Sequence, residues 1–356
     1  MRSAVFATFA VALLTLPATA QPASQNIILV TADGLRWQDA FRGLDPLLAK
    51  EKSAHMPEKD PRYQRYWRTS EAERRQALMP FFWKKLAPLG IATSNGKVTN
   101  QYRVSYPGYS EILTGRTQDD VIKGNDPIRN PTRTVLEFLR LKLGLPKEHV
   151  ALFASWERFG LIGEATEGQI VINAGYQPLE GRNVPPRIAE LSRMQSHLLT
   201  PWDEARHDYI TGEMALEYMK AIKPRVLCIS FDETDDWAHD RRYDRVLDSI
   251  AEFDRFLEKL WTTIESMKEY RGRTTLVITS DHGRGSTLED WHGHGSKVVG
   301  ADRIWMAIVG PGTPAKGEID AAVEQRDVAP TILKLMGIDP AEYKGATGKP
   351  IAAAIR

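Results

Sequence analysis

Near its N-terminus the chain reads Asn26-Ile-Ile-Leu-Val-Thr-Ala-Asp33-Gly34, a nearly continuous apolar run that ends in an acidic residue and a glycine. Such a run, without polar alternation, is typical of a strand buried on both faces of a sheet. Further runs of this kind occur at 150–154, 169–173, 225–231, 274–279 and 304–309. A sheet of such strands needs helices over both faces, so the pattern indicates an α/β fold.

Helical patterns separate these runs. Apolar residues recur at helical spacing over 79–87, 132–143, 203–222, 241–267 and 327–336. Pro131 is suited to a helix start, and Gly144 and Gly337 to helix ends. The alternation predicts one doubly wound, mostly parallel sheet flanked by helices, as a single domain over 21–356. Residues 40–78, rich in proline, basic and aromatic residues, are expected to form an insertion: either a lid near the site or a surface excursion.

The first 20 residues have the pattern of a cleaved secretory signal. Arg2 supplies a positive charge, an apolar run extends from Ala4 to Leu16, and Ala18-Thr-Ala20 is a small-x-small cleavage site. The apolar run is short for a membrane span. We therefore expect a periplasmic or secreted protein without a transmembrane anchor after cleavage.

Composition limits the partners of the chain. Its 356 residues are 42% hydrophobic and 26% charged, with a formal net charge of +1. A nearly neutral chain has no global attraction for a nucleic-acid polymer or an anionic membrane, so a small anionic substrate would need local groups or metals. The single cysteine, Cys228, cannot form an internal disulfide and is expected to be an inert buried thiol. The oligomeric state stays open.

Carboxylates and imidazoles follow three of the predicted strands: Asp33 after the first, Asp235 and His239 after 225–231, and Asp281 and His282 after 274–279, with His292 and His294 a few residues later. Ligands of doubly wound folds bind beyond the carboxyl ends of the strands, and these side chains are metal ligands. Taken singly, Asp33-Gly34 also fits a turn, and 235–240 fits a solvated acidic loop. Adjacent Asp281 and His282 at a buried strand end favour a metal, because buried polar groups need partners.

A serine lies at a predicted helix start. In Val104-Ser105-Tyr-Pro107-Gly, Pro107 is suited to the first turn, and Gly115 to the helix end. The helix N-terminus favours an anion, but a serine hydroxyl becomes a nucleophile only when a metal or base activates it. Local sequence alone also allows Ser105 to be a simple N-cap.

Together these motifs resemble the alkaline phosphatase superfamily of two-metal hydrolases, and within it the nucleotide pyrophosphatase/phosphodiesterase-like branch. The matching motifs are, in chain order, Asp-Gly at 33–34, Ser-Tyr-Pro at 105–107 with Thr-Gly at 114–115, Asp-x-x-x-His at 235–239, Asp-His-Gly at 281–283 and His-Gly at 294–295. The resemblance extends from residue 26 to about residue 340. It is specific for the superfamily and much less so for the substrate.

The resemblance implies two divalent metal ions held by carboxylates and imidazoles: Asp235, His239 and His294 for one ion, and Asp33, Asp281 and His282 for the other. Ser105 would be the nucleophile and would touch the second ion. His294 is preferred to His292 because its spacing to Gly300 and Ile304 resembles the family. Asn125 falls where the branch places an asparagine that holds a phosphoryl oxygen.

Two features depart from the relatives. The branch usually has Thr followed by Phe-Pro-Asn-His where this chain has Ser105-Tyr-Pro-Gly-Tyr109, which puts diester specificity in doubt. The Cys-x-Pro-x-Arg signature of sulfatases is absent, which argues against formylglycine chemistry.

The resemblance thus implies an exported hydrolase of small phosphate mono- or diesters that forms a phosphoseryl intermediate on Ser105. Zinc suits the donors, with Mn, Fe or Ca as alternatives. Competing interpretations are a sulfuryl or phosphonate ester hydrolase of the same superfamily, a non-catalytic metal- or anion-binding protein on this fold, and a periplasmic metal carrier.

Overall fold

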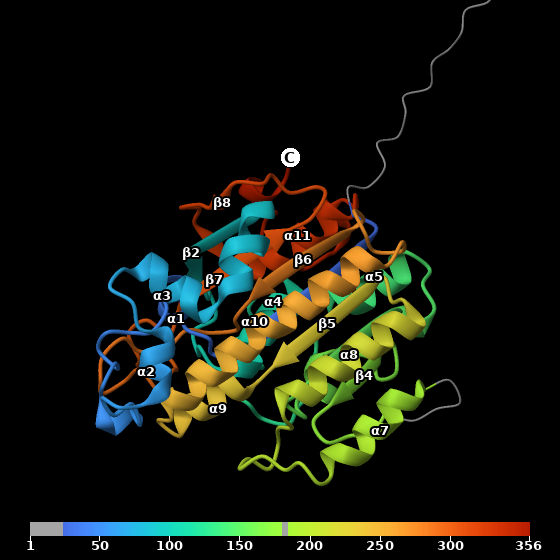
Figure 1. Cartoon of the computed structure of the whole chain (residues 1–356). Helices are drawn as coiled ribbons and strands as arrows, with labels where there is room; N and C mark the ends of the chain where they lie inside the picture. The colour runs from blue at the N-terminus through green and yellow to red at the C-terminus, as the bar shows by residue number, and fades with distance from the viewer. Residues whose placement is uncertain (1–23, 180–183) are drawn as a thin grey trace, which may run out of the picture.

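A sheet of nine strands forms the centre of the computed structural model, which describes residues 24–179 and 184–356 (Figure 1). The predicted signal segment lies outside the described residues. The strands are β1 (Asn26–Ala32), β2 (Ile91–Lys97), β3 (Val150–Ala154), β4 (Val171–Ala174), β5 (Val226–Phe231), β6 (Thr274–Thr279), β7 (Arg303–Val309), β8 (Gly317–Glu318) and β9 (Val323–Glu324). Their order is β4-β3-β5-β1-β6-β7-β2-β8, with β9 also paired to β2.

The middle of the sheet is parallel and one side is mixed. β4, β3, β5, β1 and β6 run parallel, whereas β7 is antiparallel to both β6 and β2. The carboxyl ends of β1, β5 and β6 therefore lie side by side at one edge of the sheet. That edge is where α/β folds place their ligands.

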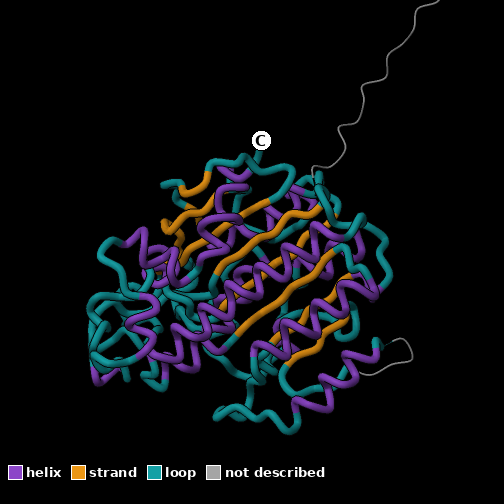
Figure 2. The backbone as a smooth tube through the Cα atoms, in the orientation of Figure 1, coloured by secondary structure: helices purple, strands orange, loops and turns teal. Residues whose placement is uncertain are grey.

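Helices cover both faces of the sheet (Figure 2). They are α1 (Trp37–Arg42), α2 (Pro61–Tyr66), α3 (Glu71–Leu78), α4 (Ser105–Thr114), α5 (Val135–Lys142), α6 (Phe159–Ile162), α7 (Pro186–Gln195), α8 (Asp208–Ile222), α9 (Glu233–His239), α10 (Tyr243–Ser266) and α11 (Val328–Leu335). Within β1, Ile28 and Val30 pack with α1, α3, α8 and α10, while Ile27 and Leu29 pack with α4, α5, α6 and α11. This alternation is why the strand is apolar throughout, and it confirms the predicted fold class.

Four segments differ from the sequence expectation. The half-polar β2 was not predicted, because it lacks a continuous apolar run. Residues 79–87 form no regular α-helix; instead, a π-helical turn covers Phe82–Leu86. The predicted helix at 203–222 begins only at Asp208, because Ala205 pairs with Trp156 in an isolated bridge. Over 174–202, read as loop, α7 starts with Pro186 at its first turn.

Residues 40–78 pack onto the body of the protein. Phe41, Leu44, Met56, Tyr66 and Leu78 are buried in the core cluster that α10 also enters. The cavity beside Ser105 is lined by other residues. Among the described residues, no helix combines the length and apolarity needed to cross a bilayer.

Candidate metal centre and nucleophile

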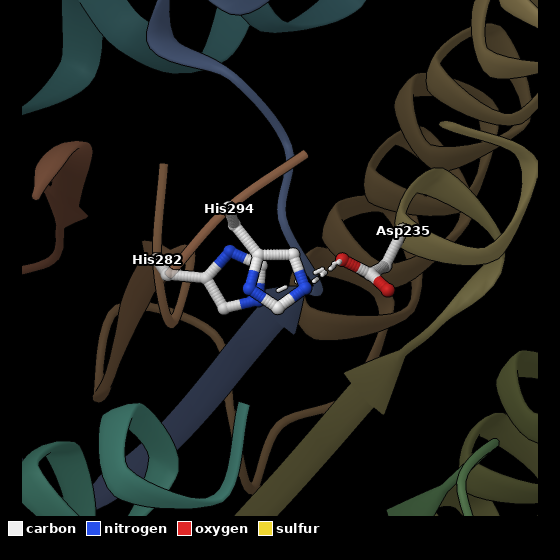
Figure 3. A group of neighbouring side chains, drawn as sticks. All are labelled: Asp235, His282 and His294. Carbon is white, nitrogen blue, oxygen red and sulfur yellow. Dashed lines mark ion pairs between the residues drawn. The ribbon is translucent and has the colours of Figure 1, made fainter. Parts of the chain in front are cut away.

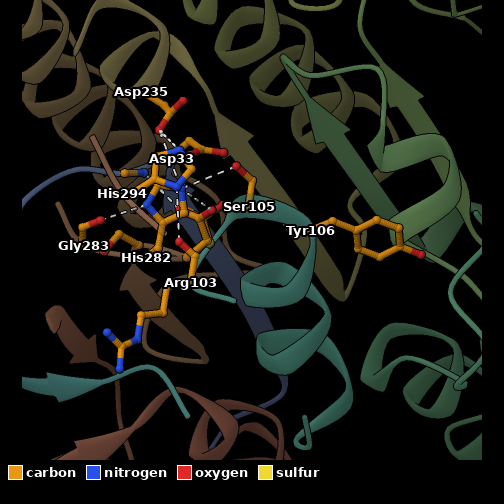
Figure 4. A network of polar contacts seen from close by, with 12 residues as sticks. Asp33, Arg103, Ser105, Tyr106, Asp235, His282, Gly283 and His294 are labelled. Atoms are coloured by element: carbon orange, nitrogen blue, oxygen red, sulfur yellow. Dashed lines mark hydrogen bonds and ion pairs between the residues drawn. The ribbon is translucent and has the colours of Figure 1, made fainter. Parts of the chain in front are cut away.

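The sheet topology brings the acidic and imidazole residues of the motifs together. Asp33 follows β1, Asp235 lies on α9 just after β5, and Asp281 and His282 follow β6. His294 enters from the loop before β7, and Ser105 is the first residue of α4. Figure 4 shows the labelled side chains Asp33, Ser105, Asp235, His282 and His294 converging beyond the strand ends.

Two groups of side chains have the geometry of a metal site. One consists of Asp33, Asp281 and His282, and the other of Asp235, His282 and His294 (Figure 3). Within each group the potential ligand atoms lie within 4.8 Å of one another. His282 Nε2 is 3.4 Å from Asp33 Oδ1, 3.4 Å from Asp281 Oδ2 and 3.6 Å from Asp235 Oδ1. The structure therefore places His282 between the groups, whereas the sequence interpretation assigned it to one of them.

Backbone carbonyls orient two of the imidazoles. His282 Nδ1 lies 3.1 Å from the Gly283 carbonyl oxygen, and His294 Nδ1 lies 3.2 Å from that of Arg103. A proton on each Nδ1 would donate to these carbonyls and leave the Nε2 lone pair for a metal. Burial and the neighbouring His282 lower the pKa of His294 to about 2, so its ring is neutral, as coordination requires.

Buried carboxylate oxygens supply the test of whether the residues fit a cation. Asp33 Oδ1 and Asp281 Oδ2 are buried and accept no hydrogen bond within the described residues. Burial, then the charge of Asp235, raises the pKa of Asp33, while burial, then the charge of Asp33, raises that of Asp281. A bound cation would supply both the missing partner and the opposite charge. The residues therefore fit a divalent metal.

Sequence analysis missed Arg284, a buried cation in this cluster. Its Nη2 contacts Asp235 Oδ1, and its Nε donates to the Gly34 carbonyl oxygen at 3.2 Å. Burial alone would raise the pKa of Asp235, but the charges of Arg284 and then His239 lower it below its usual range. The available signal was its position directly after Asp281-His282-Gly283, at the same strand end.

Ser105 is held against the cluster by the packing of α4. Its Oγ lies 3.4 Å from His282 Nε2, and the residue is buried. A Cβ on Gly108, one turn later, would lie 2.3 Å from the Asp281 carbonyl oxygen, so only glycine allows this approach. Glu111, also on α4, accepts the Thr99 and Asn100 N–H groups, at 3.0 and 2.9 Å. These contacts fix the serine at the start of the helix.

The remaining predicted residues lie at the rim. His239 Nε2 is 3.1 Å from Asp235 Oδ2 and 2.9 Å from His294 Nε2, with 47% of its side chain exposed. His292 is turned away, with its Nε2 3.0 Å from the Glu289 carbonyl oxygen. Asn125 Oδ1 accepts the Tyr106 N–H at 2.9 Å, which leaves its amide N–H groups available.

A cavity of about 430 Å³ adjoins these groups. Ser105, Asn125 and His294 line it together with tryptophans and carboxyl groups from other segments. Two of these carboxyls, Asp232 and Asp236, interact: burial, then the charge of Asp236, raises the pKa of Asp232. The volume is in the range of small-molecule sites.

Comparison with known proteins agrees with this geometry. A family model described as Sulfatase matches residues 172–338, a span that includes Asp235, His239, Asp281, His282 and His294. A solved alkaline phosphatase, PafA, has a TM-score of 0.61 at 12% identity, covering 95% of this chain and 100% of that one. A protein in the alkaline phosphatase superfamily from Vibrio parahaemolyticus has a TM-score of 0.54 at 14% identity, covering 96% and 72%. The family model covers less than half of the chain, and the structural likenesses show an alkaline phosphatase-like fold.

Two further matches carry the names of other enzymes. The phosphonate monoester hydrolase of Agrobacterium radiobacter has a TM-score of 0.55 at 13% identity, covering 92% of this chain and 78% of that one. A 2,3-bisphosphoglycerate-independent phosphoglycerate mutase from Gracilaria tenuistipitata var. liui is 23% identical over 134 residues, which are 37% of this chain and 25% of the relative. The chain thus matches about a quarter of that curated relative. At these identities the structural likenesses show the fold, and they leave the substrate and the phosphodiesterase-like branch unresolved.

Proposed function

We propose that this superfamily hydrolase cleaves small phosphate esters, with Ser105 as the nucleophile. One observation carries the proposal: Ser105 Oγ lies 3.4 Å from His282 Nε2, the atom shared by both candidate metal groups. A hydroxyl that only caps a helix has no reason to face two buried carboxylates with unpartnered oxygens.

The site residues have two roles: they bind the phosphoryl group, and they attack its phosphorus atom. Two divalent ions, held by the carboxylates and imidazoles, would supply positive charge for the phosphoryl oxygens and activate the serine hydroxyl. Ser105 Oγ attacks phosphorus while the bond from phosphorus to the ester oxygen breaks. The ester oxygen leaves with the electron pair and takes up a proton to form the alcohol, and the serine hydroxyl gives its proton to water. Asn125 offers its free amide N–H groups to a phosphoryl oxygen. Water then cleaves the phosphoserine and releases phosphate.

Replacing Ser105 by alanine tests the role of the nucleophile. Turnover of an aryl phosphate should fall to background, while the metal content, measured by mass spectrometry, stays near that of the wild type. Ser110→Ala is the matched control, because Ser110 lies on the same helix but its Oγ accepts from Gln118 Nε2. Retained activity in Ser105→Ala would show that another group attacks.

A sulfuryl or phosphonate ester is the second candidate substrate, favoured by the sulfatase family match and the phosphonate hydrolase neighbour. Formylglycine chemistry is not part of it, because Cys228 lies inside β5 and burial raises its pKa to about 12. Side-by-side turnover of aryl phosphate, aryl sulfate and aryl phosphonate distinguishes these substrates. A sulfate preference would replace our assignment.

Finer features of the proposal rest on the sequence motifs. We propose zinc as the metal, a phosphodiesterase-like ancestry, and export after cleavage near Ala20. Metal analysis of protein purified from the periplasm tests the first and third. Comparison of a bis-aryl with a mono-aryl phosphate tests the second, and a monoester preference would count against diester specificity.

A further inference from the structure

The cavity beside Ser105 has a second wall, distant in sequence from the metal motifs. Trp156 and Arg158 follow β3, and they face the segment at 202–205. Trp156 bridges to Ala205, and its Nε1 donates to Glu204 Oε2 at 3.1 Å. The wall is therefore tied together by contacts between two chain segments.

The two tryptophans of this wall, Trp156 and Trp202, have indole N–H groups that already donate hydrogen bonds within the protein. The Trp156 indole N–H is engaged by Glu204, and Trp202 Nε1 donates to Asp240 Oδ2 at 3.2 Å. Trp202 also packs edge-on against Trp237, with 4.6 Å between ring centroids. Because both N–H groups are engaged, the π-systems are what these tryptophans can offer a ligand.

The wall carries more acidic than basic side chains. Arg158, the arginine in its described lining, is paired with Glu204 at 3.2 Å. Asp203, Asp232 and Asp236 also line the cavity. Asp232 and Asp236 interact with each other, and Asp236 Oδ2 is buried and accepts no hydrogen bond within the described residues. Asp232, beside it, is only 8% exposed.

These observations restrict the group that can occupy the wall side of the cavity. A second anionic group on the substrate would be repelled by the carboxylates. A purely apolar group would leave the buried Asp236 Oδ2 without a hydrogen-bonding partner. A cation would satisfy the carboxyl groups and be attracted to the tryptophan faces.

Resting on the proposed function, we infer that the preferred ester is one whose alcohol carries an ammonium group, with the phosphoryl end at Ser105 and the cation between Trp202, Trp156 and Asp232. In the reaction the bond from Ser105 Oγ to phosphorus forms as the bond to the amino alcohol oxygen breaks. That oxygen leaves with the electron pair and takes a proton from water, while the proton of the Ser105 hydroxyl passes to water. A second water cleaves the phosphoserine, so water is the only co-reactant.

Phosphocholine and neohexyl phosphate form the matched pair of probes, because they differ only in the replacement of the charged nitrogen by carbon. We expect the metal-loaded wild type to have a kcat/KM at least about tenfold higher for phosphocholine, given the usual strength of cation–π contacts combined with a carboxylate. Calorimetry on Ser105→Ala should show the same preference in binding. Asp232→Asn, Asp203→Asn and Trp202→Leu should each lower the ratio of the two kcat/KM values. Asp120→Asn, an exposed aspartate outside the cavity, should not.

The outcomes separate this inference from the function on which it rests. Equal kcat/KM values for the two probes, with aryl phosphate still hydrolysed, would overturn the cationic substrate and leave the phosphatase proposal standing. A preference that none of the three wall variants lowers would place the cation elsewhere and overturn the assigned site. Absence of turnover for every phosphate ester would overturn both.

Discussion

Replacing Asp208 by asparagine should weaken one metal site without unfolding the protein. Asp208 is the first residue of α8, and its carboxyl oxygens accept the N–H groups of Asp232 at 2.8 Å and Glu233 at 3.1 Å, where α9 begins. In return, Glu233 Oε1 accepts the Asp208 N–H at 3.1 Å. The two helices thus cap each other, and α9 carries Asp235 and His239.

The magnitude follows from the acceptors that are lost. Asparagine keeps one oxygen and turns an N–H₂ group toward the second backbone N–H, which is left buried and unsatisfied at a cost of about 1–3 kcal/mol. If metal binding must order the first turn of α9, this cost is subtracted from the binding free energy. The dissociation constant of the metal then rises by roughly 5- to 150-fold. The site at Asp33 and Asp281 takes no carboxylate or imidazole from α9, so its affinity should fall less.

Competition with a chromogenic chelator measures both affinities. Asp254→Asn is the matched control, because Asp254 also accepts two backbone N–H groups, those of Phe81 at 2.9 Å and Phe82 at 2.8 Å, at the π-helical turn. It should lower the melting temperature but leave both metal affinities unchanged. Wild-type affinities in Asp208→Asn, equal weakening of its two sites, or the same loss in Asp254→Asn would refute the positioning role of the cap.

Three further changes have defined outcomes. Chelation should lower the melting temperature, because Asp33 and Asp281 would again be buried acids that repel each other; an unchanged scan would argue against a bound cation. Gly108→Ala should reduce turnover and stability together, since its Cβ would meet the Asp281 carbonyl oxygen at 2.3 Å; wild-type kinetics would contradict the close approach. Burial raises the pKa of Asp254 to about 6, so the folded state holds that proton more tightly. The stability of the wild type relative to Asp254→Asn should therefore fall by about 2 kcal/mol as the pH rises from about 4 to about 6 in urea titrations, and a constant difference would contradict the shift.

Local patterns predicted the parts of the fold where burial is uniform. β1, β3, β5 and β6 lie inside the sheet with helices on both faces, so their apolar runs identify them directly. β2 lies toward the mixed side and is partly exposed, and its sequence, Ile91-Ala-Thr-Ser-Asn-Gly-Lys97, has no such run. Its pairing with β7 is a long-range contact that no local pattern reports.

For the site, residue types and spacing identified Asp33, Ser105, Asp235, Asp281 and His294 as candidates. Arg284 and the tryptophan wall were missed, because a buried arginine and a tryptophan have no distinguishing pattern until their partners are known. The choice of His294 over His292 rested on spacing that resembles the family, because their local sequences are alike. The folded loop turns the first ring toward Asp235 and the second toward Glu289.

The sequence by itself determined the class of the fold and the chemical character of the site, because strand burial and ligand type are properties of short segments. The tertiary structure alone decided that His282 lies between two groups of ligands, that Arg284 holds Asp235 ionised, and that an acidic aromatic wall faces Ser105. Those features depend on distances between segments far apart along the chain, and such distances are set by the packing of the whole sheet and its helices.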